Sequence, residues 1–383
     1  MKSRRFLLAL AVLACGTPSG SSHAVLPHGR LVVERVHGAA LEGNAFGDRA
    51  DPEVAVYLPP GYDRERGRRY PVVYLLHGFG GTHGDWSERG YDGTTAPGAM
   101  DRLIAERVVP PMIVVMPTAM TRYGGSFYLN SAVNGGWEDY IARDLVAHID
   151  ARYRTIARSS ARAVAGHSMG GYGALSLAMH RPDVFAAVYA MSPCCLAWVA
   201  ELTRDSAASW RRAVRFRDPR ELRTALGEGD FLAVAFVSMA AAFSPNRASP
   251  IGVDLPFALD GDRLVPAEPG HSAWRRAFLI EQLPERARGL AGLRGIGFDV
   301  GTADEIGHIP IGARAFSRAL EAAGVPHFFK LYRGTHSDRI GERLEDAALP
   351  FLGRALTSGG ERAGRTSGER WRRPAAGPGT PSP

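Results

Sequence analysis

The sequence predicts an α/β fold in which helices cover both faces of a mostly parallel, doubly wound sheet. Short apolar runs alternate with amphipathic stretches from Val25 to Leu356, which is typical of repeated strand–helix–strand units. Two runs, 71–76 and 112–116, are apolar without interruption, as in strands buried on both faces. A third, 161–165, leads directly into a glycine-rich turn and a helix. We therefore expect one domain over residues 25–356.

The periodicity sets the order of the elements. Strands are expected where apolar runs end at turn residues: 54–58, 71–76, 112–116, 161–165, 184–191, 295–300 and 328–332. Helices are expected at 137–153, 173–180, 311–323 and 338–356. In the first helix, Ile141, Leu145 and Ile149 share one face, and Gly324 closes the third.

The segment from about 196 to 291 breaks this rhythm. It is helix-prone, interrupted by prolines and without clear strands. A doubly wound sheet binds its ligands at the carboxyl edge of its strands. We expect this segment to be an irregular insertion over that edge, where it shapes a substrate pocket.

The net charge of +7 is concentrated at the two ends of the chain. Lys2, Arg4 and Arg5 account for three positive charges. The tail 357–383 has five arginines against two glutamates and is rich in Gly, Pro and Ser, so we expect it to be disordered. The body between is close to neutral, which argues against a nucleic-acid partner.

The N-terminus, residues 1–24, has the pattern of an export signal: a basic start, an apolar run over 6–14, then small and polar residues. The run is shorter than the roughly 20 residues that span a bilayer, so no transmembrane helix is expected in the mature protein. Val12-Leu13-Ala14-Cys15 fits a lipoprotein cleavage box, which would leave a lipid anchor on Cys15. Ser22-His23-Ala24 fits a signal-peptidase site. We expect an exported protein, which is secreted, periplasmic or lipid-anchored.

Outside the leader, Cys194 and Cys195 are the only cysteines, so no disulfide framework supports the fold. A bond between adjacent cysteines would close a strained ring. We therefore expect two thiols.

Ser168 is the predicted nucleophile. It stands in Gly166-His167-Ser168-Met169-Gly170-Gly171, between an apolar strand and a helix start made of small residues. A sharp strand-to-helix turn of this kind exposes a serine hydroxyl at a sheet edge, and small neighbours let strand and helix pack closely.

A serine needs a general base, and that base needs an orienting acid. In α/β hydrolases the chain order is serine, acid, histidine. His336 follows the last expected strand and is the predicted base, with His308 as the alternative.

The acid is expected after the strand at 295–300. Asp304 and Glu305 both lie in the loop after that strand. Asp304 is the preferred acid, and Glu305 is the alternative. Asp299 lies inside the strand and is a weaker candidate.

An oxyanion hole needs two fixed N–H donors. Met169 follows the nucleophile and supplies one. The loop His77-Gly78-Phe79-Gly80-Gly81 follows an early strand, and we expect Phe79, or failing that Gly80, to supply the other. We expect His77 to brace this loop. Trp86 is assigned equally to the pocket wall and to the core.

These features resemble the esterase branch of the α/β hydrolases, which includes esterase D-type S-formylglutathione hydrolases, feruloyl and acetyl-xylan esterases, enterochelin-esterase-type enzymes and mycolyltransferases. The segments that carry the resemblance are 57–62, 70–81, 166–175, 301–305 and 334–336. It implies hydrolysis of a carboxylic ester by Ser168, His336 and an acid, with no metal or organic cofactor. Esterase members resemble this chain with aspartate at the position of Asp304, whereas mycolyltransferase-like members have glutamate where Glu305 stands, so the resemblance leaves the acid open.

The leading functional hypothesis is an exported serine carboxylic-ester hydrolase that acts on a small-molecule, glycan or lipid ester. An acyltransferase to a sugar or lipid acceptor would use the same triad. The other hypotheses are a non-catalytic surface-binding module and a cytosolic formylglutathione hydrolase.

Overall fold

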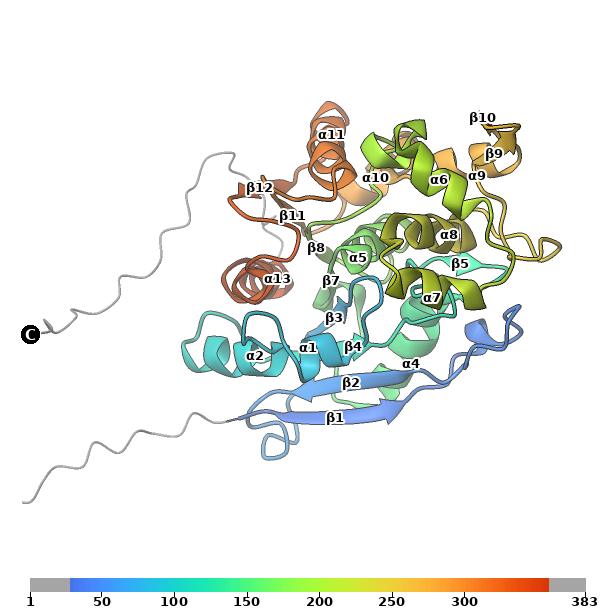
Figure 1. Ribbon diagram of the computed structural model, residues 1–383. Helices are drawn as coiled ribbons and strands as arrows, with labels where there is room; N and C mark the ends of the chain where they lie inside the picture. The colour runs from blue at the N-terminus through green and yellow to red at the C-terminus, as the bar shows by residue number, and fades with distance from the viewer. Residues whose placement is uncertain (1–27, 358–383) are drawn as a thin grey trace, which may run out of the picture.

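A computed structural model of the chain describes residues 28–357 (Figure 1). The leader expected over 1–24, with Cys15, and the tail from residue 358 lie outside this range. No helix in the described part is both long and apolar enough to cross a bilayer.

An eight-stranded sheet forms the centre of the fold, in the order β1-β2-β4-β3-β7-β8-β11-β12. The first three strands in this order pair antiparallel and all later pairs are parallel. The strands span Arg30–Arg35 (β1), Glu53–Leu58 (β2), Val72–Leu76 (β3), Ile113–Pro117 (β4), Arg162–His167 (β7), Ala187–Met191 (β8), Gly295–Gly301 (β11) and Phe328–Tyr332 (β12). The expectation of a mostly parallel, doubly wound sheet is confirmed.

Helices pack on both faces of the sheet (Figure 1). One face is covered by α2 and the C-terminal helical segment, and the other by α4, α5, α10 and α11. These helices span Ala96–Ala105 (α2), Val146–Arg152 (α4), Met169–His180 (α5), Leu279–Ala291 (α10) and His308–Ala322 (α11). The C-terminal segment consists of Ile340–Arg343 (α12), a π-helical turn over Leu344–Ala348, and Leu349–Thr357 (α13).

The central strand β3 shows why the apolar runs are continuous. Its five residues are all buried, and alternate side chains enter opposite cores. Val72, Tyr74 and Leu76 enter the core under α5, whereas Val73 and Leu75 enter the core under α2 and α13. Because helices cover both faces of the sheet, residues at odd and at even positions of the strand are buried, and both sets are apolar in the sequence.

The segment 196–291 contains helices and one hairpin. The helices are Ala207–Ala213 (α6), Arg220–Gly227 (α7), Phe231–Phe243 (α8), Gly270–Ala277 (α9) and α10. The expectation that it has no strands is wrong, because Phe257–Asp260 (β9) pairs antiparallel with Arg263–Pro266 (β10). These strands are mostly exposed and therefore lack apolar alternation, but their two-residue loop, Gly261-Asp262, is a recognisable hairpin turn.

Two elements of the main scaffold, β1 and α2, had no predicted counterpart. β1 is an edge strand with only partly buried or exposed residues, so its sequence has no buried face to reveal it. The helix expected at 137–153 is broken into Trp137–Asp139 (α3), a π-helical turn over Tyr140–Leu145, and α4.

The contact of α5 with β3 leaves no room for a side chain at Gly170. A Cβ there would lie 2.3 Å from the Leu76 carbonyl oxygen, which is backbone and cannot swing away. We expect Gly170→Ala to lower the free energy of unfolding by about 1–3 kcal/mol, the usual range for overpacking, measured by urea denaturation. Gly67→Ala is the control, since a Cβ at Gly67 meets nothing within 4 Å. Equal stability of the two variants would contradict the close-packing account.

Candidate active site

Ser168 lies on the turn between β7 and α5, and its backbone is strained. It has φ 57° and ψ −116°, a region that a residue with a Cβ rarely adopts and that costs of order 1–3 kcal/mol. The turn is held by Ser168 N–H, which donates to Met191 O at 2.9 Å. Gly166 allows the close approach, because a Cβ on it would lie 2.3 Å from Gly170 O. The sequence around Ser168 therefore produces the expected sharp turn.

His336 lies in the loop after β12 and reaches Ser168. Its Nε2 is 2.9 Å from Ser168 Oγ. The imidazole is buried, and its Nδ1 is 2.9 Å from Asp304 Oδ2. With Nδ1–H donating to the carboxylate, Nε2 is the nitrogen that can accept the serine proton.

Of the two acids after β11, Asp304 contacts the imidazole. Its side chain is 0% exposed. Glu305 instead accepts a hydrogen bond from the His336 backbone N–H at 3.0 Å, which lowers the pKa of Glu305. Both acids thus hold His336, Asp304 through the ring and Glu305 through the main chain.

Asp299, the weaker acid candidate, belongs to a buried network beneath the site. Its carboxylate accepts from Tyr189 OH at 2.8 Å and from Arg343 Nε at 3.0 Å. Arg343 also donates to Tyr332 OH at 2.7 Å and to Ser192 Oγ at 3.1 Å. This network ties the ends of β8, β11 and β12 to the C-terminal helices, and so positions the loops that follow these strands.

Among the described residues, the hydrogen-bond partner of Ser168 Oγ is His336 rather than His308, the alternative base. His308 is the first residue of α11, and its Nδ1 is 2.7 Å from Glu201 Oε1. His180, at the end of α5, pairs with Glu138 at 2.8 Å.

The two expected oxyanion donors lie beside each other. No acceptor for the Phe79 or Met169 backbone N–H occurs among the hydrogen bonds of the described residues, whereas Gly80 N–H donates to Gly124 O at 2.9 Å. The Gly80 N–H is therefore already used in a hydrogen bond, and the Phe79 N–H is the one in this loop that can still donate to a ligand. A Cβ on the adjacent Gly125 would lie 2.4 Å from Met169 Sδ and 3.1 Å from the Phe79 ring, so this second glycine-containing loop packs directly against both residues.

His77 braces the loop that contains Phe79, as expected. Its Nδ1 donates to Gly78 O at 2.7 Å, and its Nε2 accepts from Ala119 N–H at 2.8 Å. Complete burial lowers the pKa of His77 to about 4, so the ring stays neutral with this tautomer. Trp86 is buried in the core and packs on Tyr91.

Sequence reasoning missed His167, which precedes the nucleophile. Its Nε2 donates to the His336 backbone oxygen at 3.1 Å, and the two rings lie 4.8 Å apart. Burial holds the pKa of His167 well below its usual value, so it packs on His336 as a neutral ring. Its place in the nucleophile motif was the only available signal.

An apolar cavity of about 50 Å³ opens beside Ser168. Its walls combine the oxyanion loop, α8 and the start of α11: Phe79, Phe127, Met169, Leu202, Phe231, Leu232, Ala235, Phe236, Met239, Ile306 and Ile309. Because α8 belongs to the segment 196–291, that segment shapes the surroundings of Ser168.

Cys194, Cys195 and His308 complete the lining of this cavity. Both cysteines are free and buried, as expected, with their sulfurs 2.8 Å apart. Burial opposes ionisation of Cys194, but its interactions with Cys195 and His308 outweigh that and lower its pKa to about 6. Burial likewise opposes protonation of His308, but Cys194 and Glu201 raise its pKa to about 9.

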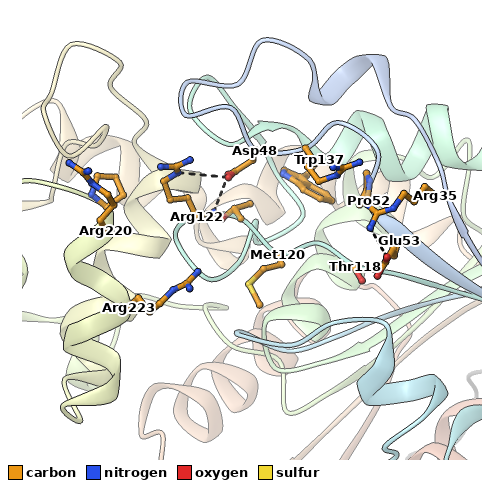
Figure 2. Close-up of a pocket in the computed structure, with 13 residues that line it drawn as sticks. Arg35, Asp48, Pro52, Glu53, Thr118, Met120, Arg122, Trp137, Arg220 and Arg223 are labelled. Carbon is orange, nitrogen blue, oxygen red and sulfur yellow. Dashed lines mark hydrogen bonds and ion pairs between the residues drawn. The ribbon is translucent and has the colours of Figure 1, made fainter.

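A larger cavity, of about 650 Å³, lies between α7 and the ends of β2 and β4, and Ser168, His336 and Asp304 are not among the residues that line it (Figure 2). Arginines dominate it, but most are paired. Arg35 contacts Glu53 at 2.6 Å, Arg122 lies 3.9 Å from Asp48, and Arg49 contacts Asp51 at 2.8 Å. These pairs neutralise most of its charge.

A mostly parallel sheet with helices on both faces, and a serine on the sharp turn between β7 and α5, defines an α/β hydrolase. The chain belongs to the family described as "Putative esterase", whose sequence model matches residues 49–339. The resemblance inferred from its motifs is therefore confirmed at the level of the family.

Two curated relatives match about a third of the chain. An endo-1,4-beta-xylanase/feruloyl esterase of Xylanibacter ruminicola is 35% identical over 133 residues, which are 34% of this chain and 18% of the relative. Esterase Rv1288 of Mycobacterium tuberculosis is 40% identical over 129 residues, which are 33% of this chain and 26% of the relative. The match thus spans well under a third of either relative's own length.

Solved structures share the fold. A ferulic acid esterase has a TM-score of 0.59 at 23% identity, covering 86% of this chain and 99% of its own. An S-formylglutathione hydrolase from Agrobacterium tumefaciens has a TM-score of 0.55 at 20% identity, covering 87% and 97%. At these identities the similarity establishes the α/β-hydrolase architecture.

Proposed function

We propose that this esterase hydrolyses carboxylic esters through Ser168, His336 and Asp304, by way of an acyl-enzyme. The observation that carries the proposal is the continuous pair of hydrogen-bonding contacts, each 2.9 Å, from Ser168 Oγ through the His336 ring to Asp304. This is the arrangement of nucleophile, base and orienting acid that acyl transfer requires.

In the first step, Ser168 Oγ attacks the ester carbonyl carbon while His336 Nε2 takes its proton. Asp304 stabilises the resulting imidazolium. The oxyanion forms opposite the Met169 and Phe79 N–H groups, where each donor contributes roughly 3 kcal/mol. His336 then gives its proton to the departing alcohol.

In the second step, water attacks the acyl-enzyme. His336 takes a proton from this water and returns it to Ser168 as the acid leaves. No step calls for a group outside the chain other than ester and water.

The cavity beside Ser168 points to a short, apolar acyl group. It is lined by aromatic and aliphatic side chains, and its volume of about 50 Å³ is well below the roughly 300–1,000 Å³ typical of drug-sized ligand sites. Phe231 at the start of α8 lines this cavity and is 41% exposed, and its ring packs edge-on against Phe79. Because two of the similar proteins are named feruloyl or ferulic acid esterases, feruloyl esters are included among the test substrates.

We also propose that the protein is exported by its N-terminal segment, with cleavage before Cys15 or after Ala24. The residues 12–15 fit the first cleavage site and the residues 22–24 fit the second.

Replacement of the nucleophile tests the mechanism. We expect Ser168→Ala to lower kcat on p-nitrophenyl esters by about 10⁴–10⁶-fold, since loss of a triad serine removes nucleophilic catalysis. The unmodified chain should hydrolyse p-nitrophenyl acetate and butyrate faster than the laurate. Methyl ferulate tests an aromatic acyl group in the same assay. A fluorophosphonate probe should label the unmodified chain at Ser168. Activity that survives in Ser168→Ala would refute the mechanism, and an unlabelled, inactive but folded chain would favour a non-catalytic role.

The two acids can be separated by amide substitutions. Asp304→Asn should lower kcat by about 10⁴-fold, because it removes the carboxylate that orients the imidazole. Glu305→Gln keeps an oxygen that can accept from the His336 N–H, so its kcat should fall far less. Steady-state kinetics on p-nitrophenyl butyrate with both variants checks this. The reverse ranking would assign the acid to Glu305 and favour the glutamate pattern of the mycolyltransferase-like members.

The mass and N-terminus of the mature protein test the export proposal. Cleavage after Ala24 should give a soluble product that is unchanged by Cys15→Ser. Cleavage before Cys15 should give a lipid-modified product in the membrane fraction, which Cys15→Ser abolishes. An uncleaved protein in the cytosol would contradict export.

A further inference from the structure

Three side chains with a preference for soft metal ions converge behind the nucleophile. Cys194 and Cys195 follow β8, and His308 begins α11. One ligand atom from each lies within 4.8 Å of the others, and all three residues are buried. The hydrolysis proposed above assigns no role to any of them.

The His308 ring is oriented as a metal ligand would be. Glu201 holds its Nδ1 at 2.7 Å and also accepts from the His308 backbone N–H at 3.0 Å. The other nitrogen, Nε2, is buried, and on that side the ring interacts with the Cys194 thiol. A neutral imidazole can therefore offer Nε2 to a metal ion that also takes the Cys194 sulfur, in place of their direct interaction. A carboxylate on the second ring nitrogen is the usual support of a metal-bound histidine.

We propose that Cys194, Cys195 and His308 bind a thiophilic divalent cation, with Zn²⁺ as the best match. Thiolate and imidazole are the ligands that Zn²⁺ prefers. Zn–S bonds of about 2.3 Å and Zn–N bonds of about 2.0–2.1 Å place tetrahedral ligand atoms roughly 3.5–3.8 Å apart. The ligand atoms already lie within 4.8 Å, and the two sulfurs, now 2.8 Å apart, need to separate by only about 1 Å. Each cysteine that binds releases its thiol proton to solvent.

The position of this site makes it inhibitory. All three residues line the cavity that contains Ser168, and Cys194 N–H donates to the Ser168 carbonyl oxygen at 3.3 Å. Three protein ligands leave the fourth tetrahedral position open. A cation here, with the water on its fourth position, fills space that the acyl group of the proposed substrate needs. The inhibition, but not the binding, rests on the proposed function.

Cobalt binding tests the site without reference to activity. The full chain with Cys15→Ser, reduced and stripped with a chelator, is titrated with Co²⁺. We expect a single equivalent to bind, with a thiolate-to-cobalt charge-transfer band and the intense visible bands of tetrahedral Co²⁺. Adding Cys194→Ser, Cys195→Ser or His308→Gln should weaken or abolish these bands. The control His271→Gln changes a histidine of the same region that packs on Trp198 outside the cluster, and should leave them intact.

Glu201→Gln provides a variant that removes no ligand. It should weaken Co²⁺ and Zn²⁺ binding by about 10–100-fold, as loss of a carboxylate behind a ligating histidine usually does. Thermal unfolding of each variant verifies that it is folded. A merely structural Glu201 would change stability and leave the metal affinity of the folded chain unchanged.

Activity then tests the consequence. Zn²⁺ should inhibit p-nitrophenyl butyrate hydrolysis in the Cys15→Ser chain, reversibly with chelator, and the ratio of activities with and without Zn²⁺ should approach one in the cysteine variants. A Co²⁺ spectrum without the thiolate band would overturn the proposal, as would a pair of cysteines that stays disulfide-bonded under reduction. Equal Zn²⁺ inhibition in every variant would also overturn it, because the cation would then bind at His336. An inactive chain that still gives the cobalt spectrum would refute the proposed hydrolysis and leave the metal site standing.

Discussion

The close approach of α5 to β3 and β7 is the constraint on which the rest of this structure depends. It requires glycine at 166 and 170, because backbone atoms lie where a Cβ would be. At the same turn Ser168 has a positive φ of 57° with ψ −116°, a strained conformation that costs of order 1–3 kcal/mol and that the surrounding packing must offset. At this turn Ser168 Oγ lies 2.9 Å from His336 Nε2, and Met169, the proposed oxyanion donor, is the first residue of α5. One backbone turn thus contains both the proposed nucleophile and a proposed oxyanion donor.

Parallel strands bring the remaining groups to the same edge. Asp304 follows β11 and His336 follows β12, so their loops meet although 32 residues separate them. The buried Asp299–Arg343 network lies just below and joins three strand ends to the C-terminal helices. A buried ion pair is weak evidence for net stability, but removal of either partner would leave a charge without compensation. Its contribution here is to hold the loops that contain Asp304 and His336, the proposed acid and base, in one geometry.

The segment 196–291 adds what the scaffold lacks. The helix α8 is almost wholly apolar and closes the cavity at Ser168, while Glu201 reaches across to His308. The same cavity therefore has an apolar side, suited to an acyl group, and a sulfur- and nitrogen-rich side next to the nucleophile. If both sides act, ester hydrolysis and cation binding compete for one small volume.

The sequence by itself determined the succession of buried strands along the chain that leads to Ser168. It also gave His336, Asp304 or Glu305, and the loop 77–81 as candidates. These follow from local rules: buried parallel strands are continuously apolar, and a strand–glycine–serine–glycine–helix turn has few alternatives. The strand β1 and the β9–β10 hairpin were not predicted, because they are mostly exposed and their sequences show no apolar face.

Only the tertiary structure decided which acid meets the imidazole. Asp304 and Glu305 are adjacent, and the path of the loop after β11 turns the first toward the ring and the second toward the main chain. The packing of His167 on His336 and the convergence of His308 on Cys194 were equally invisible in the sequence. These contacts join residues more than 100 positions apart, and no local pattern records where two distant loops will meet.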